Sequence, residues 1–292
     1  MKHRAGRAVV TGSAGFLGRH LAAGLEQAGY AVLRIDGVSM DAGDFFRYGT
    51  GFAADVAIHC AAVGADRQSI DSSPLALAVN FELDAALFRW AAEARPRRVV
   101  YISSSAAYPV LLQRDEGQRV ALKETFINPG SPQQPDGIYG WAKLTGERLA
   151  ALARDAGVPV SIVRPFSGYG EDQGTRFPFR ALAARAQRRE DPFTVWGSGS
   201  QVRDFIHVDD IVAAIMVMVR EGIDGPVNLG TGRGVTAAEL AGMFCTAEGY
   251  APEIKPTGEH EGVSYRVADT SLMEAFYVPK VDLALGIRRI LA

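Results

Sequence analysis

The stretch RAVVTGSAGFLG, residues 7–18, decides the fold of this 292-residue chain. Its first part, Arg7–Thr11, is predicted to form a short buried strand, and residues 17–28 an amphipathic helix. Three glycines with the spacing Gly-x-x-Gly-x-x-Gly connect them: Gly12, Gly15 and Gly18. The first permits a tight turn, the second lets the backbone approach a pyrophosphate, and the third lets the helix pack on the strand. Free N–H groups of the helix then point at the phosphates. The stretch therefore predicts a dinucleotide-binding unit.

Predicted strands and helices also alternate after this stretch. Strands are expected at Ala31–Ile35, 56–60, 98–103 and 158–163, and helices at 74–94 and 139–156. This alternation is typical of a parallel sheet covered by helices on both faces, which binds ligands at the carboxyl ends of its strands. After Pro165 we expect shorter elements: helices at 209–219 and 236–248, a strand at 226–229 that returns to the sheet, and irregular structure over 248–292.

The composition excludes several classes of partner. The 31 Lys and Arg residues against 33 Asp and Glu residues give a formal net charge of −2, so no overall basic field attracts nucleic acid or an anionic membrane. The longest apolar run, residues 211–219, is too short to span a bilayer, and the N-terminal residues lack the apolar segment of a signal peptide. Cys60 and Cys245 are too few for a disulfide framework or a zinc site. We therefore expect a cytoplasmic protein without a metal site.

Asp36 ends the second predicted strand, 18 residues after Gly18. A carboxylate at this place accepts hydrogen bonds from the adenosine ribose and repels a 2′-phosphate, which favours NAD over NADP. The alternative is that Asp36 only opens a turn before Gly37.

Tyr139 and Lys143 are four residues apart on a predicted helix and therefore share one face. A phenol has an ordinary pKa of roughly 10 and is a weak base at neutral pH; a neighbouring ammonium stabilises the phenolate. Ser104 follows the predicted strand 98–103, and its hydroxyl could bind the reacting oxygen. The alternative for Tyr139 and Lys143 is a pair of exposed side chains on a helix without a catalytic role. The alternative for Ser104 is a solvated loop serine.

Several segments in one order resemble a known family. They are residues 12–18, 55–62, 102–108, 139–143, 164–170, 197–210 and 227–230. Together they resemble the extended short-chain dehydrogenase/reductases, in the NAD-dependent epimerase/dehydratase branch that acts on nucleotide sugars.

The resemblance implies a Rossmann-type, doubly wound parallel sheet of α/β class with a smaller, interleaved C-terminal substrate lobe. The NAD-binding domain would comprise residues 1–167, with 204–231 returning to it, and the lobe 168–203 and 232–292. The implied catalytic residues are Ser104, Tyr139 and Lys143. The implied NAD contacts are Gly12, Gly15, Phe16, Leu17, Gly18, Asp36, Asp44, Phe45, Ala61, Ala62, Asn80, Tyr139 and Lys143. The implied substrate contacts are Arg203, Ser105, Ser167 and Arg266.

Two of these positions depart from the family pattern. Ser167 stands where relatives have Asn, and a second diphosphate-binding arginine is missing near Glu259, so Arg266 is expected to replace it. The resemblance also implies a homodimer that packs through helices 74–94 and 139–156.

The neighbours of Ser104 discriminate between reactions of the family. The 4,6-dehydratases carry an Asp-Glu pair where this chain has Ser105 and Ala106, and GDP-mannose 3,5-epimerases carry Cys in the place of Ala106. With dehydration and 3,5-epimerisation disfavoured, the remaining reaction is the removal of a hydride from one carbinol carbon and of the proton from its hydroxyl. We therefore expect NAD-dependent epimerisation of a nucleotide-activated sugar at C4 through a transient keto intermediate. An NAD(P)H-dependent ketoreductase or dehydrogenase is the alternative, and a non-catalytic dinucleotide-binding sensor is a third hypothesis.

Two further features have open interpretations. Trp196 could line a nucleoside pocket or belong to the core. His207, Asp209 and Asp210 precede or open a predicted helix, and we interpret them as capping and packing residues rather than metal ligands.

Overall fold

The structure is a computed structural model that describes residues 6–37, 40–63, 74–114, 119–128, 131, 133–258 and 263–292. The chain forms two compact units. Unit 1 consists of Met1–Ala107, Gly137–Arg164 and Val212–Val227, and unit 2 of Tyr108–Asp136, Pro165–Ile211 and Asn228–Ala292.

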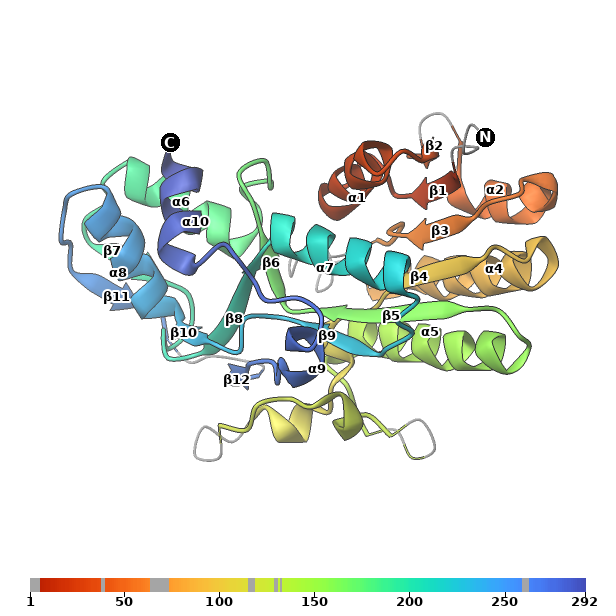
Figure 1. Ribbon diagram of the computed structural model, residues 1–292. Helices are drawn as coiled ribbons and strands as arrows, with labels where there is room; N and C mark the ends of the chain where they lie inside the picture. Colours follow the sequence, from red (N-terminus) through yellow and green to blue (C-terminus); the bar gives the residue numbers. More distant parts are fainter. Residues whose placement is uncertain are drawn as a thin grey trace. The chain divides into compact units, whose positions relative to one another are not determined.

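Unit 1 is built on a six-stranded sheet (Figure 1). Its strands, in spatial order, are β2 (Ala31–Ile35), β1 (Arg7–Thr11), β3 (Val56–His59), β4 (Arg98–Ile102), β5 (Val160–Pro165) and β9 (Val227–Leu229). The pairs from β2 through β5 are parallel. Strands β3, β4 and β5 are almost entirely buried, as expected of parallel strands with both faces covered. The predicted α/β class with a doubly wound parallel sheet is confirmed.

Two layers of helices cover this sheet (Figure 1). On one face α4 (Ala78–Ala94) packs against α5 (Gly137–Asp155) and α2 (Ala42–Tyr48). On the other face α1 (Phe16–Gln27) meets α7 (Val208–Glu221), and a Cβ atom on Gly24 of α1 would lie 3.0 Å from a methyl group of Val212. The helices therefore bury both faces of the strands and leave the strand ends for ligands.

Strand β2 is one edge of the sheet, and β9 is the other. After β2 the described chain enters α2, whose N-cap Asp41 accepts hydrogen bonds from the backbone N–H groups of Gly43 and Asp44. A short 3-10 helix, Gly49–Gly51, follows and leads into β3. A helix thus occupies the chain between β2 and β3.

Unit 2 is organised around β8 (Val202–His207). The first half of β8 pairs with β10 (Gly234–Thr236) and β12 (Tyr265–Arg266), and its second half with β6 (Ser167–Tyr169). A separate pair joins β7 (Phe193–Val195) to β11 (Ile254–Pro256). The helices of this unit are α6 (Pro178–Gln187), α8 (Ala237–Ala247), α9 (Ser271–Glu274) and α10 (Leu283–Leu291). Helices α6, α8 and α10 enclose a core that contains Phe179 and Phe244.

Two expectations from the sequence differ from the structure. The prediction of irregular structure over residues 248–292 was wrong, because the segment contains β11, β12, α9 and α10. The sequence prediction overlooked the regular apolar periodicity of α10, whereas β11, β12 and α9 have only two to four residues and give little periodic signal. The two units also divide the chain differently from the expected domains, because residues 108–136, 165–167, 204–211 and 228–231 are in unit 2. The backbone explains this, since the Leu122 N–H donates to the Val267 carbonyl and the strand partners of β8 are in unit 2.

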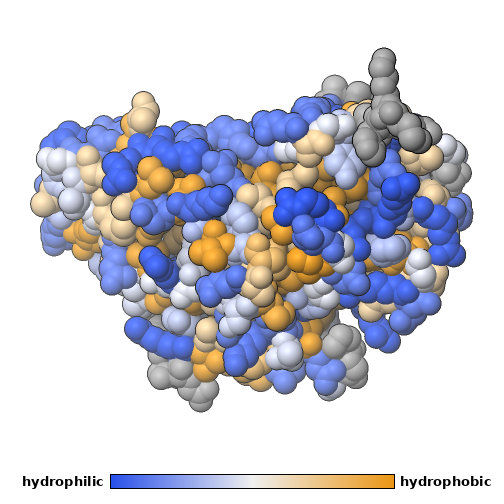
Figure 2. Space-filling model, in the orientation of Figure 1, coloured by the Kyte–Doolittle hydropathy of each residue, from blue (hydrophilic) through white to orange (hydrophobic). Residues whose placement is uncertain are grey.

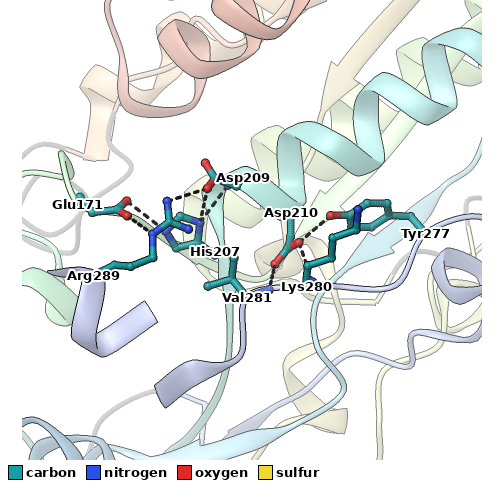
Figure 3. Close-up of polar contacts among 8 residues, drawn as sticks. All are labelled: Glu171, His207, Asp209, Asp210, Tyr277, Lys280, Val281 and Arg289. Carbon is teal, nitrogen blue, oxygen red and sulfur yellow. Dashed lines mark hydrogen bonds and ion pairs between the residues drawn. The ribbon is translucent and has the colours of Figure 1, made fainter. Parts of the chain in front are cut away.

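His207 and Asp209 lie in a charged network that joins β8 to α10 (Figure 3). The buried His207 places Nε2 3.1 Å from a Glu171 carboxylate oxygen, and its Nδ1 accepts a hydrogen bond from the Asp209 N–H. Arg289 of α10 forms ion pairs of 2.5 Å with Glu171 and 2.9 Å with Asp209. The network joins the C-terminal helix to the rest of unit 2, in agreement with a packing role.

Asp210 holds the segment before α10 (Figure 3). Its carboxylate accepts hydrogen bonds from the Tyr277 hydroxyl at 2.6 Å and from the N–H groups of Lys280 and Val281. Three donors satisfy this buried carboxylate, so its role is structural.

Over the described residues, no helix is both long and apolar enough to cross a lipid bilayer. On the face that Figure 2 shows, hydrophilic residues are distributed widely, with apolar residues between them.

Candidate active site

The glycine turn after β1 touches the loop that follows β3. Gly12 has a φ of +65°, which favours glycine. A Cβ atom at Gly12 would lie 2.6 Å from the backbone nitrogen of Ala61, and one at Gly18 would collide with the Gly12 carbonyl. The first glycine therefore admits the neighbouring loop and the third admits the helix, as the spacing predicts.

The N-terminus of α1 suits an anion such as a pyrophosphate. Gly15 is its N-cap, no side chain caps it, and its first turn contains no acidic residue. Helices α8 and α10 are capped by the side chains of Thr236 and Asp282, whereas α4, α6 and α9, like α1, have no side-chain cap. The first N–H groups of α1, where Phe16 and Leu17 lie, therefore fit the phosphates of a dinucleotide.

Asp36 lies next to this turn. Thr11 pairs with Ile35 across the β1–β2 ladder, and the Ser13 N–H donates to the Ile35 carbonyl over 3.0 Å. Asp36 directly follows, so the sheet holds it beside the glycine turn, the place expected for a ribose-binding carboxylate.

Asp44 and Phe45 are placed differently from the other expected NAD contacts. Asp44 is exposed in the first turn of α2. Phe45 is only 4 % exposed, and its ring packs 5.6 Å from that of Phe46 and 5.5 Å from that of Trp90. A ring committed to the core has no free face for adenine.

Asn80 fixes the loop beside the glycine turn. Its Oδ1 accepts a hydrogen bond from the Val63 N–H at 2.8 Å, and its Nδ2 donates to the Val63 carbonyl at 2.9 Å. The side chain is buried, so these two bonds hold the loop that carries Ala61 and Ala62. The structure therefore gives Asn80 a positioning role.

Lys143 is a buried cation beneath Tyr139. It is 4 % exposed, and its Nζ donates to the Ile102 carbonyl over 3.0 Å. The same Nζ lies 5.8 Å from the centre of the Tyr139 ring, and Tyr139 is half-buried. The i, i+4 spacing on α5 thus brings ammonium and phenol together, as predicted, in an environment that strengthens their interaction.

The three serines after β4 have different surroundings. Ser103 donates to Glu147 over 2.5 Å, and Glu147 is also held by Arg164 through two hydrogen bonds of 2.8 and 2.7 Å. Ser105 is buried in the 3-10 helix Ser105–Ala107. Ser104 remains half-exposed, and its Oγ accepts from the Ala106 N–H at 3.1 Å. Its hydroxyl hydrogen can therefore be donated to a ligand.

The two positions after Ser104 carry no acid or base, because they are Ser105 and Ala106. Ala106 stands next to Ser105 in a buried turn. Burial raises the pKa of the Cys60 thiol to about 12, although Lys143 acts in the opposite direction. The thiol therefore stays protonated near neutral pH and is a poor base.

Unit 2 brings Arg203 and Arg266 together. They face each other in the register of β8 and β12. Arg203 donates to the carbonyls of Val202 and Val263, and Arg266 donates to Gln113 at 2.5 Å and Asp136 at 2.6 Å. Sequence reasoning missed Gln113 and Asp136, which lie far from both arginines along the chain and carry no motif.

This pair carries excess positive charge. Burial, and then the neighbouring Arg266, lowers the pKa of Arg203 to about 9, while Asp136 acts in the opposite direction. A planar guanidinium pair with one carboxylate is suited to bind a diphosphate.

Two other residues of unit 2 were singled out from the sequence. Ser167 begins β6 and pairs with Phe205 of β8. Trp196 is 62 % exposed, which excludes a core role. In the described part of the chain, no cluster of three or more His, Cys, Asp or Glu residues could hold a metal ion.

Comparisons with known proteins identify the family of this chain. Residues 8–230 match the model of the NAD dependent epimerase/dehydratase family. The chain is 31 % identical over 199 residues to GDP-mannose 3,5-epimerase of Arabidopsis thaliana. This aligned region covers 66 % of this chain and 52 % of that protein. The chain thus spans about half the length of the plant relatives that it matches.

Two further similarities extend over almost the whole chain. It is 29 % identical to dTDP-4-dehydro-6-deoxy-D-allose reductase of a Streptomyces species, over 92 % of this chain and 90 % of that protein. The crystal structure of the UDP-glucose 4-epimerase of Thermus thermophilus in complex with NAD superposes with a TM-score of 0.82 at 24 % identity, covering 98 % of this chain and 97 % of that one.

Proposed function

Since this chain belongs to the NAD dependent epimerase/dehydratase family, we propose that it epimerises a nucleotide-activated sugar at one carbinol carbon, C4, through a transient keto sugar. Its cofactor is NAD. The observation that carries the proposal is the buried Lys143 ammonium, bonded to the Ile102 carbonyl beneath the Tyr139 ring. Ser105 and Ala106 supply no acid–base pair for the elimination of water. The reaction that remains is the removal of a hydride and a proton at one carbinol carbon.

The three catalytic residues of unit 1, Ser104, Tyr139 and Lys143, are proposed to have separate roles in this reaction. A bound NAD, held by the glycine turn before α1, would supply the hydride acceptor and donor for the sugar carbon. Tyr139 as phenolate accepts the proton of the reacting hydroxyl, and Lys143 stabilises that phenolate. Ser104 donates a hydrogen bond to the same oxygen as it becomes a carbonyl. Once the keto sugar has rotated so that its opposite face meets the nicotinamide, Tyr139 returns the proton to the new hydroxyl.

The residues of unit 2 are proposed to bind the rest of the substrate. Arg203 and Arg266 would hold the diphosphate, and the exposed Trp196 offers a ring for the nucleobase. Ser167 would donate a hydrogen bond to the sugar, and Ser105, a residue of unit 1, is proposed to do the same. The pair of guanidinium groups favours an activated sugar over a free one.

The test is conversion of nucleotide sugars followed by NMR, with NAD present only in trace amounts. UDP-, GDP-, CDP- and dTDP-sugars are supplied one at a time. We expect net epimerisation, which Tyr139→Phe should slow by at least about a hundredfold and which Tyr48→Phe, a change at an exposed tyrosine, should leave intact. Absence of conversion with every nucleotide would refute the proposal.

A ketoreductase is the second candidate. It is favoured by the similarity to the Streptomyces reductase along 92 % of the chain. Such an enzyme consumes one NAD(P)H for each carbonyl reduced, whereas an epimerase consumes none. The loss of nicotinamide absorbance with keto sugars therefore separates the two. A non-catalytic sensor would bind NAD and a nucleotide sugar without converting either.

We also propose that the protein forms a homodimer through α4 and α5. On α5 the apolar side chains of Ile138, Trp141 and Leu152 are exposed, and their spacing places them on one face. A cytoplasmic location and the absence of nucleic-acid and membrane partners stay predictions from composition.

A further inference from the structure

A chain of buried polar side chains lies behind Lys143 in unit 1. Tyr101 donates its hydroxyl hydrogen to Oδ2 of Asp84 over 2.6 Å. Oδ1 of Asp84 lies 3.3 Å from Nε2 of His59, an electrostatic contact without good hydrogen-bond alignment. Nδ1 of His59 lies 2.7 Å from the hydroxyl oxygen of Thr11. The side chains of His59 and Asp84 are 0 % and 3 % exposed, and no step of the proposed mechanism uses them.

The contacts around His59 fix the orientation of its ring. The Thr11 hydroxyl oxygen, which lies against Nδ1 of His59, also accepts from the Ala61 N–H at 3.4 Å. Nε2 on the other side of the ring faces Asp84. Burial raises the pKa of Tyr101 well above its ordinary value, so its hydroxyl stays a donor. Asp84 is therefore a buried carboxylate that accepts a hydrogen bond from Tyr101 and lies against the His59 ring.

Helix α5 leaves space for this carboxylate. A Cβ atom at Gly146 would lie 2.6 Å from Oδ2 of Asp84 and closer still to the Tyr101 hydroxyl. Gly146 is less than one turn from Lys143, so the helix that carries the lysine also accommodates the anion. Such close approach of backbone to a buried pair is a reason for glycine within a helix.

The charges around Lys143 leave Asp84 as its natural counterpart. Nζ of Lys143 lies 5.4 Å from the centre of the Tyr101 ring, whose hydroxyl binds Asp84. Glu147 is already paired with Arg164 through two hydrogen bonds. The titratable and charged groups around Lys143 and Tyr101 are Tyr139 and Glu147 on α5, Asp84 on α4, His59 and Cys60 at the end of β3, and Arg164 on β5.

We propose that Asp84, held by Tyr101 and His59, is the buried counter-charge of Lys143 and positions its ammonium against Tyr139. Opposite charges attract more strongly in the interior than in water. Tyr101 contacts both groups, with its hydroxyl on the Asp84 carboxylate and the Lys143 ammonium 5.4 Å from its ring centre. Asp84 is a positioning residue, and its role rests on the proposed function of Tyr139.

A double-mutant cycle in urea unfolding tests the charge pairing without any substrate. The variants are Asp84→Asn, Lys143→Met and the two combined. Each single change leaves one charge without its partner, so the combined variant should be less destabilised than the sum, by at least about tenfold in the unfolding equilibrium. Additive effects would overturn the proposal. A control cycle of Asp84→Asn with Tyr108→Phe, in unit 2, should be additive.

The ionisation of Tyr139 in the NAD complex tests the positioning role. It is followed by near-ultraviolet absorbance, as the difference between each protein and the same protein carrying Tyr139→Phe. In Asp84→Asn a negative charge is lost, so a phenolate forms more easily and the ammonium loses its proton more easily. Both ionisations should therefore move to lower pH, by about one unit.

Tyr101→Phe and Tyr108→Phe form a matched pair for this titration. Both tyrosines are fully buried; Tyr101 donates to Asp84 at 2.6 Å and Tyr108 to Asn228 at 2.7 Å. Tyr101→Phe removes a donor from Asp84, which then binds a proton more readily, so the shift has the same direction as in Asp84→Asn. Tyr108→Phe should give no shift.

Two results would overturn the positioning role: an unchanged Tyr139 titration in folded, NAD-bound Asp84→Asn, or an equal shift in Tyr108→Phe. The pH range of turnover should move with the titration. If the unchanged protein converts no nucleotide sugar, the proposed function fails, while the cycle and the titration still decide the role of Asp84.

Discussion

Three fully buried tyrosines offer an internal comparison of what a hydroxyl group contributes to stability. Tyr101, Tyr108 and Tyr169 are each 0 % exposed, so replacement by phenylalanine removes one interior oxygen in every case. The hydroxyl of Tyr101 binds the Asp84 carboxylate at 2.6 Å, and that of Tyr108 binds the neutral amide of Asn228 at 2.7 Å. The hydroxyl of Tyr169 has no hydrogen-bond partner among the described residues.

These partners decide the sign and the size of each change. Tyr169→Phe removes a buried polar group that gains nothing in return, so the free energy of unfolding should rise by about 1 kcal/mol. Tyr108→Phe loses a neutral hydrogen bond and should lower that free energy by about 1–1.5 kcal/mol. Tyr101→Phe removes a donor from a buried carboxylate and should lower it by about 2–3 kcal/mol.

Urea unfolding followed by tryptophan fluorescence and by circular dichroism measures these differences. If the two units unfold separately, Tyr101→Phe moves the transition of unit 1, and the other two variants move that of unit 2. From the most to the least stable, the expected order is Tyr169→Phe, the unchanged protein, Tyr108→Phe and Tyr101→Phe. A Tyr169→Phe variant as destabilised as Tyr108→Phe would refute the reasoning, because it would mean that the unpaired hydroxyl contributes as much as a bonded one.

Four further predictions concern the site. Tyr139→Phe should lower turnover by about 10²- to 10⁴-fold and leave NAD affinity within about threefold by calorimetry; a comparable loss of NAD affinity would contradict a role as base. The pKa of Arg203 is lowered from 12.5 to about 9, so the folded protein loses this positive charge as the pH rises through that value. The affinity for a nucleoside diphosphate, measured by calorimetry, should then fall, while the affinity for NAD should not change. A constant affinity for the diphosphate across that pH range would argue against the arginine pair. Gly12→Ala places a Cβ atom 2.6 Å from the backbone of Ala61 at a φ of +65° and should abolish NAD binding in a protein that circular dichroism shows to be folded; retained NAD binding would show that the contact is dispensable. Trp141→Glu should shift the mass measured by light scattering from dimer to monomer, and an unchanged mass would rule out the α5 face.

Local spacing made part of the site predictable. The turn between β1 and α1 depends on glycine at fixed intervals, and the Tyr139–Lys143 pair depends on the helical repeat; both are properties of residues close together in the chain. For Ser104 the spacing had to be combined with a family resemblance, and the structure then showed that Ser103 is bonded to Glu147. Phe45 is the opposite case, since only the packing of α2 shows that its ring belongs to the core.

The amino-acid sequence alone determined the alternation of strands and helices, the dinucleotide turn and the phenol–ammonium pair, because short-range periodicity encodes all three. Contacts between distant segments were decided by tertiary structure. Arg203 and Arg266 meet through the pairing of β8 with β12, and Asp84 reaches Tyr101 and His59 only because α4 packs across β3 and β4. Such contacts depend on how elements pack in three dimensions, and a buried charge acquires its partner only when the core closes around it.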